Sequence, residues 1–271
     1  MSEVKTGTEN TSPQPQLKEE PKYNFPTEIV ELPSKGLVYP EDSPLASGKI
    51  TMKYMKAKEE DIITNQNYIQ KGKAIDHLLN ALIITPGVKQ DDLITGDKNA
   101  VLIASRILGY GANYKFEYMG ENVEVDLSTL ENKEIDYSLI EGRTNEFEFT
   151  LPHTETPITF RLLTGKIENK ITAELKGLAK INKLKSAEMS TRMKHLIASV
   201  NGNDDRKTIR DFVDTNLLAR DAKALRDYIA KIQPDVNIKF DFEDYDGEIK
   251  EREIPITSGF FFPDPEWGEG V

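Results

Sequence analysis

The chain has 271 residues, of which 38% are hydrophobic and 30% charged, and its formal net charge is −11. This composition is typical of a soluble protein with a modest core, and the negative charge argues against binding to the phosphate backbone of nucleic acids. The absence of cysteine excludes disulfides and thiolate zinc ligands. No apolar run reaches the roughly 18 residues that a membrane-spanning helix needs. The first residues contain no apolar secretion signal.

The first segments of the chain are rich in polar residues and proline. Residues 1–22 are polar and contain three prolines, so we expect this segment to be disordered. The part that follows is expected to lie as an extended arm, because three further prolines exclude a helix there: Pro33, Pro40 and Pro44. Apolar and polar side chains then alternate over residues 49–55, which predicts a half-buried strand.

Residues 57–109 are predicted to be helical. One apolar stripe follows the spacing of three and four residues that a helix requires: Ile75, Leu78, Leu79 and Leu82. Gly72 is expected to end the helix before this stripe. Either Thr95 or Asp97 is expected to cap the next helix with its side chain, and a Gly-Tyr-Gly stretch is expected to end that helix.

From residue 114 to about residue 163 the apolar period changes to two. Residues 114–127 predict a hairpin whose turn is the sequence Met-Gly-Glu-Asn. Residues 145–163 predict a second hairpin with Phe147 and Phe149 on one face. The two prolines that bound its loop are harmless there, because the loop needs few backbone donors.

Helical spacing returns over residues 166–232, in stripes that include Ile197 and Val200. An Asn-Gly-Asn-Asp-Asp stretch within this part is expected to be a loop with a capping aspartate. The segment that follows, residues 237–256, predicts an acidic hairpin with a type I′ turn at Asp246-Gly247.

This order of elements predicts an α+β fold, in which helical blocks alternate with antiparallel β-hairpins between an extended N-terminal arm and a C-terminal aromatic tail. We expect three parts. Residues 1–22 are the disordered segment, residues 23–145 hold the arm, the first helices and the first hairpin, and residues 146–271 hold the second hairpin, the second helical block, the acidic hairpin and the tail.

No motif in the sequence predicts catalysis. The glycines at 109–113 lack the third glycine of a dinucleotide fingerprint, and Gly165-Lys166 lacks the remaining residues of a phosphate loop. The three histidines are isolated, with no paired acid or nucleophile: His77, His153 and His195. The acidic hairpin lacks the full ligand pattern of a calcium loop, and strand alternation explains its charges as a solvated face. We therefore predict no enzyme, no catalytic residues, no cofactor and no metal.

Two features instead favour binding to other proteins. Eight basic residues against three acidic ones lie between residues 166 and 195, which is either a solvated helix face or a docking face for an acidic partner, such as the acidic hairpin of a neighbouring copy. The C-terminal tail carries three consecutive phenylalanines and the only tryptophan. Because neighbouring residues of an extended segment point in opposite directions, the rings must be covered, either by the chain itself or by a partner.

Three stretches of the sequence together resemble the T4-like bacteriophage baseplate hub protein family: residues 32–72, residues 82–111 and residues 149–165. The resemblance implies a structural or assembly protein of the central baseplate hub of a contractile-tailed phage. The alternative that it leaves open is a transient chaperone for another hub or tape-measure protein, which is absent from the finished virion. Many family members carry Cys-x-x-Cys pairs in their hairpin turns, whereas this chain has none, so zinc is not expected.

The resemblance also implies partners and a location. The partners would be other phage hub or tail proteins, without nucleic acid or membrane and with self-association as a further option. The location would be the host cytoplasm during assembly and then, for a retained part, the tail baseplate of the virion. The expected contact residues lie in the arm, the basic stripe and the tail: Leu37, Tyr39, Lys176, Lys180, Lys183, Phe260, Phe261, Phe262 and Trp267.

Overall fold

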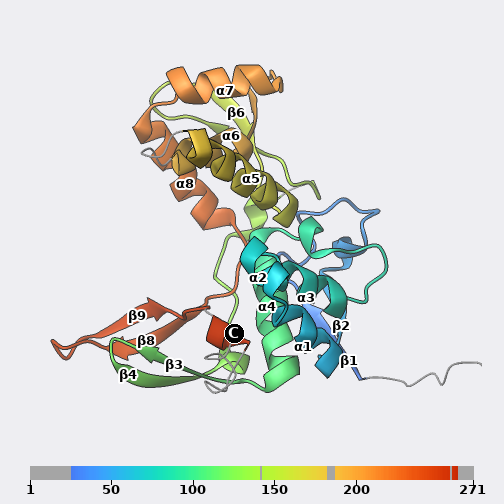
Figure 1. Ribbon diagram of the computed structural model, residues 1–271. Helices are drawn as coiled ribbons and strands as arrows, with labels where there is room; N and C mark the ends of the chain where they lie inside the picture. The colour runs from blue at the N-terminus through green and yellow to red at the C-terminus, as the bar shows by residue number, and fades with distance from the viewer. Residues whose placement is uncertain (1–25, 141, 182–186, 257, 262–271) are drawn as a thin grey trace, which may run out of the picture.

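The computed structural model describes residues 26–140, 142–181, 187–256 and 258–261 (Figure 1). Within these ranges the chain forms eight α-helices and nine β-strands. The strands make four small antiparallel sheets, three of them with two strands and one with three. This confirms an α+β fold built with β-hairpins. The segment 1–22, for which the sequence predicts disorder, lies outside the described residues.

The N-terminal half begins with a hairpin and continues with helices: β1 (Thr27–Glu31), β2 (Lys49–Lys53), α1 (Ala57–Ile63), α2 (Gln66–Lys71), α3 (Ala74–Leu82) and α4 (Thr95–Tyr110). β1 pairs with β2, so the expected extended arm is wrong from Thr27 onward. The loop between these strands is folded inward, and Leu32, Val38 and Leu45 are buried in it. The prolines do exclude an α-helix here, but they do not stop the loop from closing on itself.

The helical predictions for this half are largely confirmed. Leu78, Leu79 and Leu82 of α3 are fully buried, as their spacing predicts. Gly72 ends α2 in the left-handed conformation, with φ of 65°. The predicted cap of α4 is wrong, because Ile94 occupies that position and no side chain caps the helix.

Two hairpins lie side by side at one end of the molecule (Figure 1). They comprise four strands: β3 (Asn113–Tyr118), β4 (Glu121–Asp126), β8 (Lys239–Glu243) and β9 (Ile249–Glu253). Aromatic rings fill the space between them, with Phe116 and Tyr118 packed edge to face against Phe240 at centroid distances of 5.1 and 5.3 Å. Edge-to-face packing at this distance adds to the stabilisation that burial alone provides.

The two hairpin turns differ. Met119 and Gly120 both have positive φ, which is the conformation of a two-residue type I′ turn. In the acidic hairpin only Gly247 of the loop has positive φ, and the amide of Asp244 donates to the carbonyl of Glu248. The predicted type I′ turn at Asp246-Gly247 is therefore wrong. The loop has three residues, with a left-handed glycine last, which is the next most common way to close a hairpin.

The remaining elements lie at the opposite end of the molecule (Figure 1). They are β5 (Phe147–Thr150), β6 (Pro157–Phe160), α5 (Gly165–Ile181), α6 (Glu188–Leu196), β7 (Ile197–Val200), α7 (Arg206–Thr215) and α8 (Ala219–Ile232). The predicted hairpin of β5 and β6 is confirmed, and Asp205 caps α7 by accepting from the Thr208 amide. The predicted helical stripe is wrong at Ile197 and Val200, because these residues form β7, which pairs with β6.

Two backbone pairings far apart in sequence join the parts of the fold. The amide of Thr95 donates to the carbonyl of Leu163, and the amide of Gly165 donates to the carbonyl of Leu93. Near the end of α8, residues 131–133 pair with residues 235–237. The chain after α8 thus returns to the first half of the fold.

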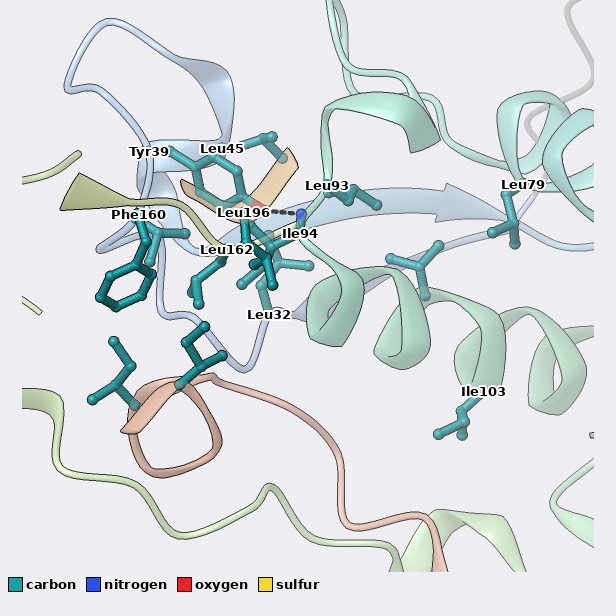
Figure 2. Close-up of a cluster of buried hydrophobic side chains, with 14 of the residues drawn as sticks. Leu32, Tyr39, Leu45, Leu79, Leu93, Ile94, Ile103, Phe160, Leu162 and Leu196 are labelled. Atoms are coloured by element: carbon teal, nitrogen blue, oxygen red, sulfur yellow. Dashed lines mark hydrogen bonds between the residues drawn. The ribbon is translucent and has the colours of Figure 1, made fainter. Parts of the chain in front are cut away.

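The buried side chains form one hydrophobic cluster that includes both ends of the molecule. Figure 2 shows Leu32 and Leu93 from the first half close to Phe160, Leu162 and Leu196 from the second. A shared core of this kind fixes the positions of the surfaces that surround it.

The beginning of the aromatic tail is covered by the chain itself. Phe260 and Phe261 are 1% and 2% exposed. The Phe260 ring packs edge to face on Tyr114 of β3 at 5.0 Å between centroids, and Phe261 packs on Phe260 at 5.2 Å. These two rings therefore dock in cis and are not free to bind a partner. Phe262 and Trp267 lie outside the described residues.

Candidate protein-binding surfaces

The loop between β1 and β2 does not present its predicted contact residues. Tyr39 is 6% exposed, and its hydroxyl donates to Oδ2 of Asp97 at 2.7 Å and accepts from the amide of Ile94 at 3.0 Å. Leu37 is half-buried and packs against the core. The prediction that Tyr39 binds a partner is therefore wrong, because the residue is an internal anchor of the loop.

Asp97 is the centre of this anchor. It is fully buried in the first turn of α4, and its carboxylate accepts from the amide of Ser34 at 2.9 Å and from the Ser34 hydroxyl at 2.6 Å. Burial raises the pKa of Asp97, and the nearby carboxylate of Asp235 acts in the same direction. Burial, together with the charge of Asp97, also raises the pKa of Tyr39. The cluster ties the loop to α4 and is structural.

The raised pKa of Asp97 predicts a pH effect on stability. Below about pH 3.9, the pKa of an aspartate in an unfolded chain, the carboxyl of Asp97 is protonated in both the folded and the unfolded protein. Its contribution to the free energy of unfolding is then complete. As the pH rises through the folded pKa, the folded protein ionises a buried group and loses that contribution. We expect the free energy of unfolding of the wild type, minus that of Asp97→Asn, to fall between pH of about 4 and about 8. Urea denaturation at several pH values measures the difference, and a difference that grows with pH contradicts the sign.

α5 packs on α6 through one side, and near its start Asn169, on the other side, donates to Oδ1 of Asp91 at 2.7 Å. Ile171 is buried on the side that packs on α6, and both acidic residues of the helix make ion pairs with α6 or α7. Arg192 lies 2.9 Å from Glu168, while Glu174 lies 2.9 Å from His195. Because the acidic side chains of α5 are neutralised within the chain, its lysines are left without compensation by their own helix.

The opposite side of α5 carries a row of exposed lysines, here called the α5 lysine face: Lys166, Lys170, Lys176 and Lys180. At about 100° per residue these positions fall within an arc of about 120°, opposite Ile171. Among the residues that the structure describes, none of them forms an ion pair. The sequence prediction therefore holds for the exposure of Lys176 and Lys180, whereas Lys183 lies outside the described residues.

The outward side of the β8–β9 hairpin is strongly acidic. Its exposed carboxylates and one isoleucine are called the acidic hairpin face: Asp241, Glu243, Glu251, Glu253 and Ile249. Asp241 lies directly opposite Glu251 in the pairing, and only Glu251 has a basic partner in the described residues, Lys239 at 2.7 Å. Lys239 lies on the same side of the hairpin, directly opposite Glu253, so one ammonium group stands against four carboxylates and the face keeps a net negative charge.

Exposed apolar residues also gather at the tips of the paired hairpins. Met119 is at the first turn, Tyr245 at the second, and the Tyr245 hydroxyl donates to the carbonyl of Met119 at 3.2 Å. Ile249, just beyond the second turn, is 71% exposed. These residues were not predicted as a binding surface, although an apolar side chain beside a hairpin turn is a local signal that indicates one.

Among the described residues, the three histidines make separate contacts, and His195 lies 2.9 Å from the carboxylate of Glu174. His77 stacks at 4.2 Å on Tyr68, and the His153 backbone amide donates to Asp221. Within the described ranges no three His, Asp or Glu side chains are arranged to hold a metal ion. In the same ranges no helix has the length and apolar character needed to cross a membrane.

Comparisons of the chain with protein-family models, with curated proteins and with solved structures find no match.

Proposed function

We propose that the chain is a structural or assembly protein of the baseplate hub of a contractile-tailed bacteriophage, and that it acts by binding other proteins. The observation that carries the binding role is the α5 lysine face, an uncompensated cationic side of a helix on a chain with net charge −11. A protein partner with acidic groups would neutralise this side, whereas solvent alone leaves its lysines repelling one another.

The three stretches that resemble the hub family are distant in sequence but meet in space. The first lines the core through Leu32, and the second and third join where the amide of Thr95 donates to the carbonyl of Leu163. The three stretches therefore include residues of the shared core. The α5 lysine face and the acidic hairpin face lie outside them.

Mass spectrometry of finished tails, and of the hub intermediates that precede them, tests this proposal. A retained structural part would be present at constant ratio to other hub proteins in both samples. A transient chaperone would be present in the intermediates of the host cytoplasm and absent from finished tails. Absence from both samples would contradict either form of the proposal.

A further inference from the structure

We propose that the α5 lysine face receives the acidic hairpin face of a second copy of this chain, so that copies associate head to tail. The inference rests on the proposed protein-binding role of the α5 lysine face, but it does not depend on the phage assignment. It names the occupant of a surface that the structure leaves without a partner.

The charges of the two faces are complementary. The α5 lysine face offers four ammonium groups that have no ion pair within the described chain. The acidic hairpin face offers Asp241, Glu243 and Glu253, which likewise make no ion pair there, together with Glu251. Bringing the faces together would relieve lysine repulsion on one and would give Asp241, Glu243 and Glu253 cationic partners on the other.

The spacing of the charges also agrees. Lys176 and Lys180 are four residues apart on a helix, which separates them by about 6 Å along its axis. Asp241 and Glu243 are two residues apart on a strand, which separates them by about 7 Å. A strand laid along the helix can therefore place successive carboxylates near successive ammonium groups.

The contact must be made between copies. Figure 1 shows α5 at one end of the molecule and the β8–β9 hairpin at the other, and the shared core holds both ends in place. A contact between two different faces is heterologous, so it closes into a ring or continues as an open chain. Ile249 lies on the acidic hairpin face beside Glu243 and adds apolar area to the contact.

Sedimentation velocity of the purified full chain over a concentration series provides the test. We expect reversible association at about 0.1 M salt, where the screening length is about 10 Å, and its loss at about 1 M, where that length is about 3 Å. The double variant Lys176→Glu/Lys180→Glu and the double variant Asp241→Lys/Glu243→Lys should each weaken association by about tenfold or more. Each variant places like charges on both sides of the contact.

Mixing the two double variants is the sharper measurement. The reversed helix of one then faces the reversed hairpin of the other, and the remaining faces of the pair keep their natural charges. We expect the mixture to associate as strongly as the wild type. The matched control Lys58→Glu/Lys71→Glu changes net charge by the same amount at exposed lysines of α1 and α2, and it should leave association unchanged.

Several outcomes would overturn the inference. They are a wild type that stays monomeric at both salt concentrations, a mixture that fails to associate although each variant is folded, and a control that weakens association as much as the α5 variant. A monomeric chain that still enters hub intermediates would leave the proposed function standing and would rule out the head-to-tail contact.

Discussion

Replacing both described phenylalanines of the tail, Phe260→Ala/Phe261→Ala, is expected to lower the free energy of unfolding by about 5 kcal/mol or more. A buried Phe→Ala substitution costs about 3–5 kcal/mol, and the two rings touch each other, so the sum is not simply additive. The loss also leaves Tyr114 without its edge-to-face neighbour. Because small proteins have total stabilities of about 5–15 kcal/mol, the variant should be largely unfolded in dilute denaturant.

Guanidinium denaturation followed by circular dichroism measures this effect. The control is Tyr245→Ala, which removes an aromatic side chain that is 81% exposed and should change stability by less than about 0.5 kcal/mol. A double variant as stable as the wild type would show that the two rings are not docked in cis, and it would return the tail to the set of partner-binding candidates.

The second large effect is expected at Gly96, in the first turn of α4. A Cβ atom added there would lie 1.8 Å from the carbonyl oxygen of Pro234, a backbone atom that cannot move independently. We expect Gly96→Ala to cost about 3 kcal/mol, the upper part of the usual range for overpacking. The substitution should also weaken the contact between α4 and the segment after α8, where the side-chain amide of Asn99 donates to Oδ1 of Asp235 at 3.0 Å.

Gly177→Ala in α5 is the matched control for this prediction. A Cβ atom at Gly177 would meet nothing within 4 Å, and alanine is favoured over glycine inside a helix by about 1 kcal/mol. The same substitution should therefore destabilise one helix and stabilise the other, as urea denaturation would show. Equal effects of the same sign would contradict the close approach of α4 and the segment after α8.

The hairpins were predictable because their signals are local. Alternation of apolar and polar residues fixes which face is buried, and Phe240 and Phe242 are buried as that rule requires. The turn type was harder to predict. An Asp-Gly pair suits a type I′ turn, but a three-residue loop ending in glycine uses the same residues, and here Gly247 serves that loop.

Strand β7 was not predictable from periodicity. All four of its residues are buried, including the polar Ser199, so no alternation of buried and exposed positions marks a period of two, and the run continues the apolar spacing of α6. A short buried strand and a buried helical turn have the same pattern. Only the pairing with β6, whose sequence lies about forty residues earlier, decides between them.

The candidate surfaces were predictable to different degrees. Helical periodicity alone places Lys176 and Lys180 on the solvated side of α5, and the structure agrees. Tyr39 was misjudged because the residue that buries it, Asp97, lies 58 positions away and has no local signature. For the same reason Asp97 was expected to cap its own helix, although its carboxylate holds a distant loop.

We propose that this chain acts by binding proteins through the α5 lysine face during assembly of a phage tail hub. Cross-linking of purified hub intermediates with an amine-reactive reagent, read out by mass spectrometry, tests that claim most directly. We predict that Lys166, Lys170, Lys176 and Lys180 form cross-links to another chain far more often than the exposed control lysines Lys58 and Lys71. Intermolecular cross-links from the control lysines but none from α5, or a chain found in no hub intermediate, would contradict it.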